Sequence, residues 1–288
     1  MQVTSDFKEY KLLDTSNGEK LESWNGVILR RPDPEVIWPS PNKDSWKADA
    51  SYVRSERGGG SWTKGNNVPD VWQIHYKDLT FNLKLMGFKH TGLFPEQASN
   101  WDIIIDRIKS SKRDDVKVLN LFAYTGGASI AALSAGASVV HVDSSRGMVE
   151  WAKENAKSSG LEDKPIRYIV DDVKKFVKRE IRRENKYDII IMDPPSFGRG
   201  SSGEVWNIET DLYDLVSDAS KLLSDDPIMF LINSYTTGLS MSVLENILLL
   251  TVDKDHKGSI VKDEIGIKVE DSNIVLPCGL FVRWETKK

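Results

Sequence analysis

From residue 116 onward, short apolar runs of strand length alternate with segments in which apolar residues recur at helical spacing. The apolar runs predict strands at residues 116–122, 137–142, 165–170, 187–192 and 227–232. The intervals predict helices at residues 146–159, 172–184, 209–223 and 240–250. Two final β runs follow without a helix between them, at 259–268 and 273–284, so one strand must be antiparallel. We therefore expect an α/β fold with a doubly wound, seven-stranded, mostly parallel sheet and an antiparallel last strand.

Residues 1–90 show a different pattern, with short alternating or aromatic runs separated by turn-rich pieces. This is typical of a small β-rich unit, so we predict a β-rich appendage at 1–90 and the α/β domain at 91–288. Tryptophan is concentrated in the appendage, at Trp24, Trp38, Trp46, Trp62 and Trp72. We favour a core-filling role for these rings, because aromatic side chains dominate small cores. The alternative is stacking on single-stranded bases, helped by the nearby Arg30, Arg31, Arg54 and Arg57.

Between residues 116 and 134 an apolar strand stops at two glycines and a helix of small residues begins at once. Gly126 and Gly127 allow a backbone too crowded for a side chain, so a ligand can approach the main chain closely. Nucleotide-like ligands bind at such turns in doubly wound folds. Asp143 ends the next predicted strand, where a carboxylate can accept hydrogen bonds from both hydroxyls of a ribose. The turn lacks the Gly-x-Gly-x-x-Gly pattern, which favours an adenosyl group without a pyrophosphate.

Acidic or turn-forming residues follow four successive predicted strands, at 123–127, 143–145, 171–172 and 193–197. The carboxyl ends of parallel strands meet at one edge of a sheet, so these loops should line a single crevice. An aspartate after a strand can also serve only as the N-cap of the next helix, and Asp172 is well placed for that role. Four such features in register nevertheless favour a binding site over a set of isolated caps.

The run from Asp193 to Phe197 is the most specific of these loops. Its two prolines fix the backbone and donate no hydrogen bonds, so the Asp193 carboxylate and neighbouring carbonyls can accept them from a substrate amine. Phe197 is a candidate for stacking on a base. The residues that follow supply two more candidates for substrate contact: Arg199, for a phosphate, and Trp206, for a base or for anchoring the loop.

The composition is that of an ordinary globular chain, with 40% hydrophobic and 28% charged residues. No apolar run approaches the ~20 residues of a membrane span and the first residues lack a signal-peptide pattern, so we expect a cytoplasmic protein without a membrane partner. The net charge of −4 argues against a strongly basic nucleic-acid-binding body, although a local basic groove remains open. One cysteine and four scattered histidines form no metal-ligand cluster, so no metal is expected.

The glycine turn, Asp143, Asp172 and the Asp193-Pro-Pro-Ser-Phe run together resemble class I S-adenosylmethionine-dependent methyltransferases. Within that family the chain is most similar to the group that modifies bases of large-subunit ribosomal RNA. The resemblance covers roughly residues 85–284, and residues 91–97 look like the family's lid motif. It implies S-adenosylmethionine as the cofactor and RNA, above all ribosomal RNA, as the partner.

The resemblance also implies roles for particular residues. It implies that the cofactor is bound by Phe94, Gln97, Ala123, Tyr124, Thr125, Gly126, Gly127, Asp143, Ser144, Asp172, Val173 and Asp193. In this set Asp143 would hold the ribose, Asp172 and the Val173 amide would read the adenine edge, and the lid residues Phe94 and Gln97 would close over it. The catalytic residues that it implies are Asp193, Pro194, Pro195 and Phe197.

The chain departs from relatives that methylate carbon 5 of cytosine, which add a cysteine thiolate to the ring to activate it. Where those relatives carry cysteines, this chain has Pro195-Ser196 and residues 232–235, and its single cysteine, Cys278, lies in the last β run. We therefore favour transfer to an exocyclic nitrogen, which needs mainly alignment of the reactants. Methyl transfer to a protein or small molecule, a non-catalytic cofactor-binding module and a nicotinamide-dependent oxidoreductase remain alternatives, and the sequence does not distinguish a monomer from a homodimer.

Overall fold

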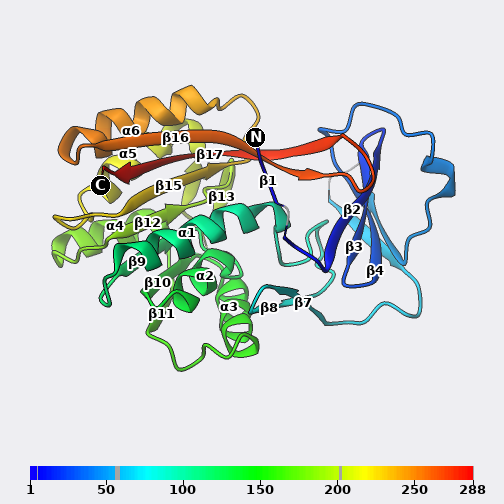
Figure 1. The fold of residues 1–288 in the computed structure, drawn as a ribbon, viewed down its shortest axis with the longest axis horizontal. Helices are drawn as coiled ribbons and strands as arrows, with labels where there is room; N and C mark the ends of the chain where they lie inside the picture. The colour runs from blue at the N-terminus through cyan, green and yellow to red at the C-terminus, as the bar shows by residue number, and fades with distance from the viewer. Residues whose placement is uncertain (5, 56–58, 201–202, 288) are drawn as a thin grey trace. The chain divides into compact units, whose positions relative to one another are not determined.

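The computed structural model describes residues 1–4, 6–55, 59–200 and 203–287 (Figure 1). Its internal contacts divide the chain into two compact units. Unit 1 comprises Met1–Ser99 and Ile265–Cys278, and unit 2 comprises Asn100–Glu264 and Gly279–Lys288. The division differs from the sequence-based boundary at residue 90, because unit 1 extends to residue 99 and also includes a segment near the C-terminal end of the chain.

A large sheet, most of whose strands belong to unit 2, has the strand order β1-β16-β17-β15-β12-β9-β10-β11. Its strands are β1 (Gln2–Val3), β9 (Lys117–Leu121), β10 (Ser138–Asp143), β11 (Ile166–Val170), β12 (Ile189–Met192), β15 (Met229–Ser234), β16 (Gly258–Lys268) and β17 (Val275–Thr286). Strands β9 to β12 and β15 pair in parallel, and β17 is antiparallel to β15, as the sequence predicts. The seven predicted strands are present, and the two-residue β1 adds an eighth beside β16. Strands β16 and β17 each contribute residues to both units.

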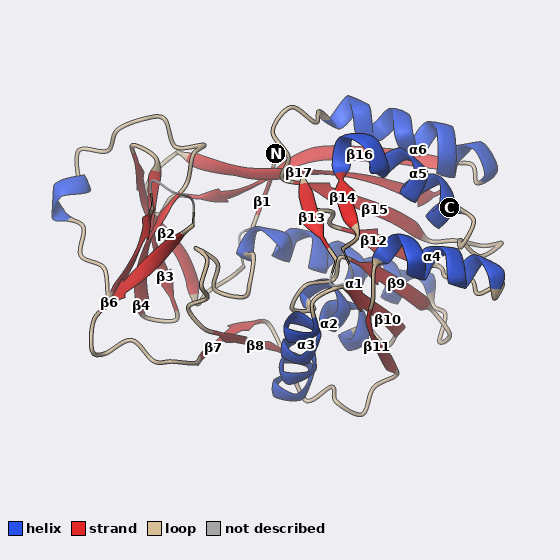
Figure 2. Ribbon diagram, turned by 180° about the vertical axis from the view of Figure 1, so that it is seen from behind, coloured by secondary structure: helices blue, strands red, loops and turns tan. Residues whose placement is uncertain are grey.

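Helices cover both faces of this sheet (Figures 1 and 2). The helices are α1 (Ala98–Ser111), α2 (Gly127–Ser134), α3 (Arg146–Ser158), α4 (Val173–Arg182), α5 (Ile208–Ser220) and α6 (Met241–Asp255), with the 3₁₀ helices Lys43–Ser45 and Pro95–Gln97. Helices α4, α5 and α6 share one hydrophobic cluster with the sheet. Helix α4 shows why, because Val173, Phe176, Val177 and Glu180 recur at helical spacing and are its buried positions. The doubly wound α/β fold is confirmed.

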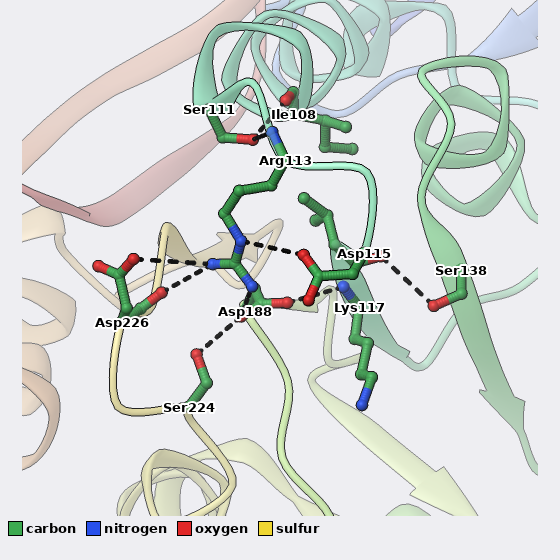
Figure 3. A network of polar contacts seen from close by, with 10 residues as sticks. Ile108, Ser111, Arg113, Asp115, Lys117, Ser138, Asp188, Ser224 and Asp226 are labelled. Atoms are coloured by element: carbon green, nitrogen blue, oxygen red, sulfur yellow. Dashed lines mark hydrogen bonds and ion pairs between the residues drawn. The ribbon is translucent and has the colours of Figure 1, made fainter.

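At the amino ends of β9 and β12 a polar network stabilises the sheet (Figure 3). Asp188, which is only 3% exposed, accepts hydrogen bonds from the Arg113 guanidinium, the Lys117 backbone N–H and the Ser224 hydroxyl, each at 2.8 Å. Arg113 also donates to Asp115 at 3.3 Å. A buried carboxylate costs free energy unless it is paired and hydrogen-bonded, and Asp188 meets both conditions.

Unit 1 contains a five-stranded sheet in the order β2-β3-β4-β5-β6 and a separate two-stranded sheet, β7-β8. Its strands are β2 (Tyr10–Ser16), β3 (Glu19–Trp24), β4 (Val27–Pro32), β5 (Ala50–Arg54), β6 (Gly60–Lys64), β7 (Trp72–Tyr76) and β8 (Leu79–Leu83). Trp24 is fully buried and Trp72 is 9% exposed, so these two rings fill the core. The ring of Trp24 lies edge-on to Tyr10 with 4.8 Å between centroids.

The other three tryptophans of unit 1 are half-buried, and each indole N–H donates a hydrogen bond within the unit. Trp38 donates to the Thr15 hydroxyl at 3.0 Å and Trp46 to the Asp14 carboxylate at 2.9 Å. Trp62 donates to the backbone carbonyls of residues 86 and 88 at 2.9 and 3.0 Å. These contacts give all five rings a structural role. Stacking on RNA bases stays a prediction for the exposed edges of the half-buried rings.

Two of the four arginines that the sequence places beside the tryptophans, Arg30 and Arg31, form ion pairs within unit 1. Arg31 forms a buried two-pronged ion pair with Glu22 at 2.6 and 2.7 Å, and Arg30 forms a similar pair with Glu19 at 2.9 and 2.6 Å. Burial alone would raise the pKa of Glu22, but the charges of Arg31 and Lys20 lower it to about 2. Arg57 lies outside the described residues.

Candidate active site

The first candidate loop follows β9 and has an unusual backbone. Phe122, Tyr124 and Gly126 have φ angles of 54°, 50° and 89°. L-amino acids rarely adopt positive φ, and such strained backbone concentrates at functional sites. Gly126 is the N-cap of α2, and a Cβ added there would lie 3.0 Å from the Cβ of Ala152. A side chain at residue 126 would therefore be crowded as well as strained by the positive φ, and the turn leaves the first backbone amides of α2 at the sheet edge.

The carboxylate of Asp143, at the end of β10, links the second loop to the first. It accepts hydrogen bonds from the backbone N–H groups of Tyr124 and Ser145, both at 2.8 Å. No cation of the described residues pairs with it, in contrast to Asp188 at the other edge of the sheet. Burial raises the pKa of Asp143, and the two backbone hydrogen bonds oppose that rise. Its remaining lone pairs can accept hydrogen bonds from hydroxyls of a ligand, and the neighbouring Ser144 is exposed.

Buried polar side chains support the glycine turn from beneath. Asn155 of α3 is fully buried and donates a hydrogen bond to the carbonyl of Thr125 at 2.9 Å. The hydroxyl of Ser129 accepts from Asn120 at 2.9 Å and lies 3.0 Å from Nδ1 of His141. Burial lowers the pKa of His141 to about 4, so its ring is neutral near pH 7. We did not predict these residues from the sequence, since a single polar residue on an apolar face shows no pattern.

The third loop carries two adjacent aspartates between β11 and α4. Asp172 is the N-cap of α4 and accepts a hydrogen bond from the Lys175 backbone N–H at 2.9 Å. Asp171 accepts one from the Asp172 N–H at 2.8 Å and pairs with Arg179. The capping role considered for Asp172 is therefore present. Reading of an adenine edge by Asp172 and the amide of Val173 stays a prediction, and one carboxylate can do both because it has two oxygens.

The fourth loop follows β12 and contains the Asp193-Pro-Pro run. The Asp193 N–H donates a weak hydrogen bond of 3.4 Å to the carbonyl of Leu121. Pro194 is buried whereas Pro195 is exposed, and the carbonyl of Pro195 accepts a hydrogen bond from the Trp206 indole at 2.6 Å. This bond fixes the turn from outside. The half-buried Asp193 side chain therefore projects from a rigid backbone.

In the stretch 197–206, which we expected to be a loop, two short strands, β13 (Phe197–Arg199) and β14 (Val205–Asn207), pair as an antiparallel hairpin. Trp206 is 6% exposed and its ring lies 5.0 Å from that of Phe122, so it anchors the hairpin, the second of the two roles considered for it. Phe197 is 56% exposed. The Arg199 guanidinium lies 6.0 Å from the centre of the Phe197 ring. The sequence candidates Phe197 and Arg199 thus share one exposed strand.

Strands β9, β10, β11 and β12 are parallel neighbours, so the four loops meet at the carboxyl edge of the sheet (Figure 2). This edge carries the predicted residues of 123–127, 143–144, 172–173 and 193–199. Phe94 and Gln97 belong to unit 1, where Phe94 is half-buried and Gln97 is 7% exposed. Their role as a lid stays a prediction.

Comparison with known proteins identifies the family. The profile of a family described as S-adenosylmethionine-dependent methyltransferase matches residues 51–234, more than half of the chain. The chain belongs to this family. It is therefore a methyltransferase, and its cofactor is S-adenosylmethionine, as the sequence predicts.

Solved structures agree with this assignment. A SAM-dependent methyltransferase from Agrobacterium tumefaciens is 34% identical, with a TM-score of 0.91 over 98% of this chain and 92% of that chain. A methyltransferase solved in complex with SAH shares the fold, with a TM-score of 0.74 at 19% identity over 97% of this chain and 76% of that one.

Curated relatives carry the name ribosomal RNA large subunit methyltransferase K/L. The protein from Pseudoalteromonas atlantica is 34% identical over 59% of this chain and 24% of its own length. The one from Colwellia psychrerythraea is 28% identical over 69% of this chain and 28% of its own length. The chain thus spans about a quarter of the length of these relatives.

The chemistry at the carboxyl edge fits S-adenosylmethionine. Asp143 accepts only backbone N–H groups among the described residues, so its remaining lone pairs can accept from ribose hydroxyls, and the first amides of α2 and α4 can donate to polar atoms of a cofactor. Each individual contact stays a prediction. The described part of the chain contains no cluster of three or more possible metal ligands, and none of its helices is long and apolar enough to cross a membrane.

Proposed function

We propose that this methyltransferase modifies a base in RNA, with large-subunit ribosomal RNA as the first substrate to test. The names of the curated relatives support this substrate class. The chain spans only about a quarter of the length of those relatives, so the proposal must also rest on the site itself. The cytoplasmic location expected from the sequence is part of the same proposal, because an enzyme that modifies ribosomal RNA must be in the same compartment as that RNA.

The observation that carries the proposal is the arrangement around Asp193. A rigid acidic turn is followed directly by Phe197, which is 56% exposed, and by Arg199 on the same strand. Unpaired RNA bases are recognised by stacking on aromatic rings and by hydrogen bonds to their polar edges. Phe197 supplies a ring, Asp193 supplies an acceptor for an amine and Arg199 supplies a cation for the backbone phosphate.

The site favours a nitrogen over carbon 5 of a pyrimidine as the methyl acceptor. The single cysteine, Cys278, belongs to unit 1, and burial raises the pKa of its thiol well above the ordinary value. It is therefore a poor nucleophile. At the positions where a nucleophile would be expected, Ser196 is hydrogen-bonded to Thr236 at 2.7 Å and Ser234 is 1% exposed.

Transfer to nitrogen makes modest demands on the protein. Bound S-adenosylmethionine supplies an electrophilic methyl group on a positively charged sulfur. The Asp193 carboxylate would accept a hydrogen bond from the substrate amine and so orient the lone pair of the amine nitrogen toward that methyl group. Transfer of the methyl group to the nitrogen would leave S-adenosylhomocysteine as the product, and the Asp193 carboxylate or water would take the proton that the methylated nitrogen loses. Alignment of two reactants in this way supplies a large part of a rate enhancement.

The proposal is tested with labelled methyl transfer from S-adenosylmethionine to RNA, protein and metabolite fractions of a strain that lacks the gene. We expect label in ribosomal RNA with the wild-type enzyme and none with Asp193→Ala. Label in the protein or metabolite fraction would refute RNA as the substrate. Cofactor binding without transfer to any fraction would favour the non-catalytic alternative.

A further inference from the structure

The loop after β15 lies beside the Asp193 loop. Strands β12 and β15 are parallel neighbours, and Met192 is paired with Ile232. Continued in the same register, Ser196 falls opposite Thr236. The 2.7 Å hydrogen bond between their hydroxyls shows that the two loops keep this register beyond the sheet. Tyr235 therefore lies beside the Asp193-Pro-Pro turn.

The ring of Tyr235 has a defined position. It packs on the backbone of Gly279 in β17, where an added Cβ would lie 2.9 Å from Cδ1 and 3.0 Å from Cε1 of the ring. Despite this contact the residue is 37% exposed. A tyrosine whose ring packs on a glycine and that is still 37% exposed presents a defined aromatic surface at little cost in side-chain entropy.

Two exposed aromatic residues thus follow adjacent parallel strands, Phe197 after β12 and Tyr235 after β15, with Asp193 at the base of the first loop. Aromatic rings on neighbouring loops at the mouth of a site are the common means of binding unpaired bases. We infer that Tyr235 is a second aromatic contact for the RNA substrate and stacks on an unpaired base of the bound strand. The inference rests on the proposed function, since it assigns a residue to RNA at the same site.

The test compares Tyr235→Ala, Tyr235→Leu and Tyr235→Phe, with ribosomal RNA from a strain lacking the gene as the substrate. Leucine keeps an apolar side chain over Gly279 but lacks a flat ring, and phenylalanine keeps the ring without the hydroxyl. Tyr213, which is 47% exposed on α5, provides the matched control Tyr213→Ala. The measured quantities are KM and kcat for RNA and the dissociation constant of S-adenosylmethionine.

We expect Tyr235→Ala and Tyr235→Leu to raise KM for RNA by about 10-fold, because stacking on one base contributes of that order. Tyr235→Phe and Tyr213→Ala should match the wild type, and all four variants should bind S-adenosylmethionine normally. If Tyr235→Leu or Tyr235→Ala retains the wild-type KM, the aromatic contact is refuted. A similar loss of cofactor affinity would assign Tyr235 a structural role instead.

The same experiment separates the inference from the proposed function. If the wild-type enzyme transfers label to a non-RNA fraction only, the proposed function fails and the inference fails with it. If the wild-type enzyme methylates RNA and Tyr235→Ala is indistinguishable from it, only the inference fails.

Discussion

The two edges of the central sheet in unit 2 both carry aspartates, yet they use them differently. At the amino edge Asp188 is 3% exposed and is neutralised by Arg113 (Figure 3). At the carboxyl edge Asp143 accepts only backbone N–H groups and has no cationic partner among the described residues. The protein supplies Asp188 with a cation and two further donors, whereas Asp143 keeps spare lone pairs that a ligand can use. The presence of a cationic partner, more than the presence of an acid, distinguishes Asp188 from Asp143, which we predict to bind the cofactor.

The largest effect should come from Asp193→Ala at the carboxyl edge. Removal of the carboxylate leaves the substrate amine without its orienting acceptor, and misalignment of this kind lowers kcat by about 100-fold or more. Folding stability should change little, because Asp193 is half-buried at a loop. Single-turnover methyl transfer and denaturant unfolding measure the two quantities. A variant with wild-type kcat would remove Asp193 from the chemistry.

At the amino edge, Arg113→Ala should lower stability and leave function unchanged, the opposite of Asp193→Ala. Loss of the guanidinium leaves the buried Asp188 carboxylate without its cation, and we expect the free energy of unfolding to fall by about 2 kcal/mol. Under conditions in which the variant is still folded, its affinity for the cofactor should stay unchanged. Arg113→Lys keeps the charge and should recover part of the stability. Weakened cofactor binding by a folded Arg113→Ala would contradict the separation of the two edges.

Asp143→Ala should reduce cofactor affinity by about 10- to 100-fold, because hydrogen bonds to a charged group are worth roughly 1.5 to 3 kcal/mol. Calorimetric titration with S-adenosylhomocysteine gives the affinity. Asp143→Asn is the matched control. Its amide oxygen can still accept a hydrogen bond, so its cofactor affinity should lie between that of the wild type and that of Asp143→Ala. Unchanged affinity in both variants would exclude Asp143 from the cofactor site.

Acidification should produce the smallest and most selective effect. Burial raises the pKa of Asp143, so it takes up its proton at a higher pH than an ordinary aspartate does, and cofactor affinity should fall as it does so. Burial alone would also raise the pKa of Glu285, at the amino edge, but hydrogen bonds from Arg107 and Arg283 hold it below the ordinary value. A lowered folded-state pKa gives stability that is present above the unfolded-state pKa and lost as pH falls through the folded one.

On lowering the pH, cofactor affinity should therefore decline before the contribution of Glu285 to stability is lost. Calorimetry and denaturant unfolding as functions of pH check this order, and Asp143→Asn should abolish the first change only. A coincident loss of affinity and stability would mean that both edges titrate as one network.

Much of unit 2 could be predicted from the sequence because its elements have strong local patterns. The apolar run of β12 marks a strand that is buried on both faces, and Asp172 marks the start of α4. The β13–β14 hairpin could not be predicted in this way. Its strands have three residues each, too few to show a period, and it depends on the long-range contact of Trp206 with Pro195.

The loop positions of the candidate site followed from the order of strands, but the support beneath them did not. Asn155 and His141 are single polar residues within otherwise apolar faces, and only the folded chain brings them under the glycine turn. Likewise, no local signal assigns residues 265–278 to unit 1, because that assignment depends on contacts with residues far away in the sequence.

The most direct test of the difference between the two edges is hydrogen–deuterium exchange of the wild-type protein with and without S-adenosylhomocysteine. We predict slower exchange on binding in peptides that contain residues 122–128, 143–146 and 172–175, at the carboxyl edge. Peptides that contain residues 112–117 and 224–228, at the amino edge, should exchange at unchanged rates. Protection confined to the amino edge, or no protection at the carboxyl edge under saturating ligand, would contradict the location of the cofactor site.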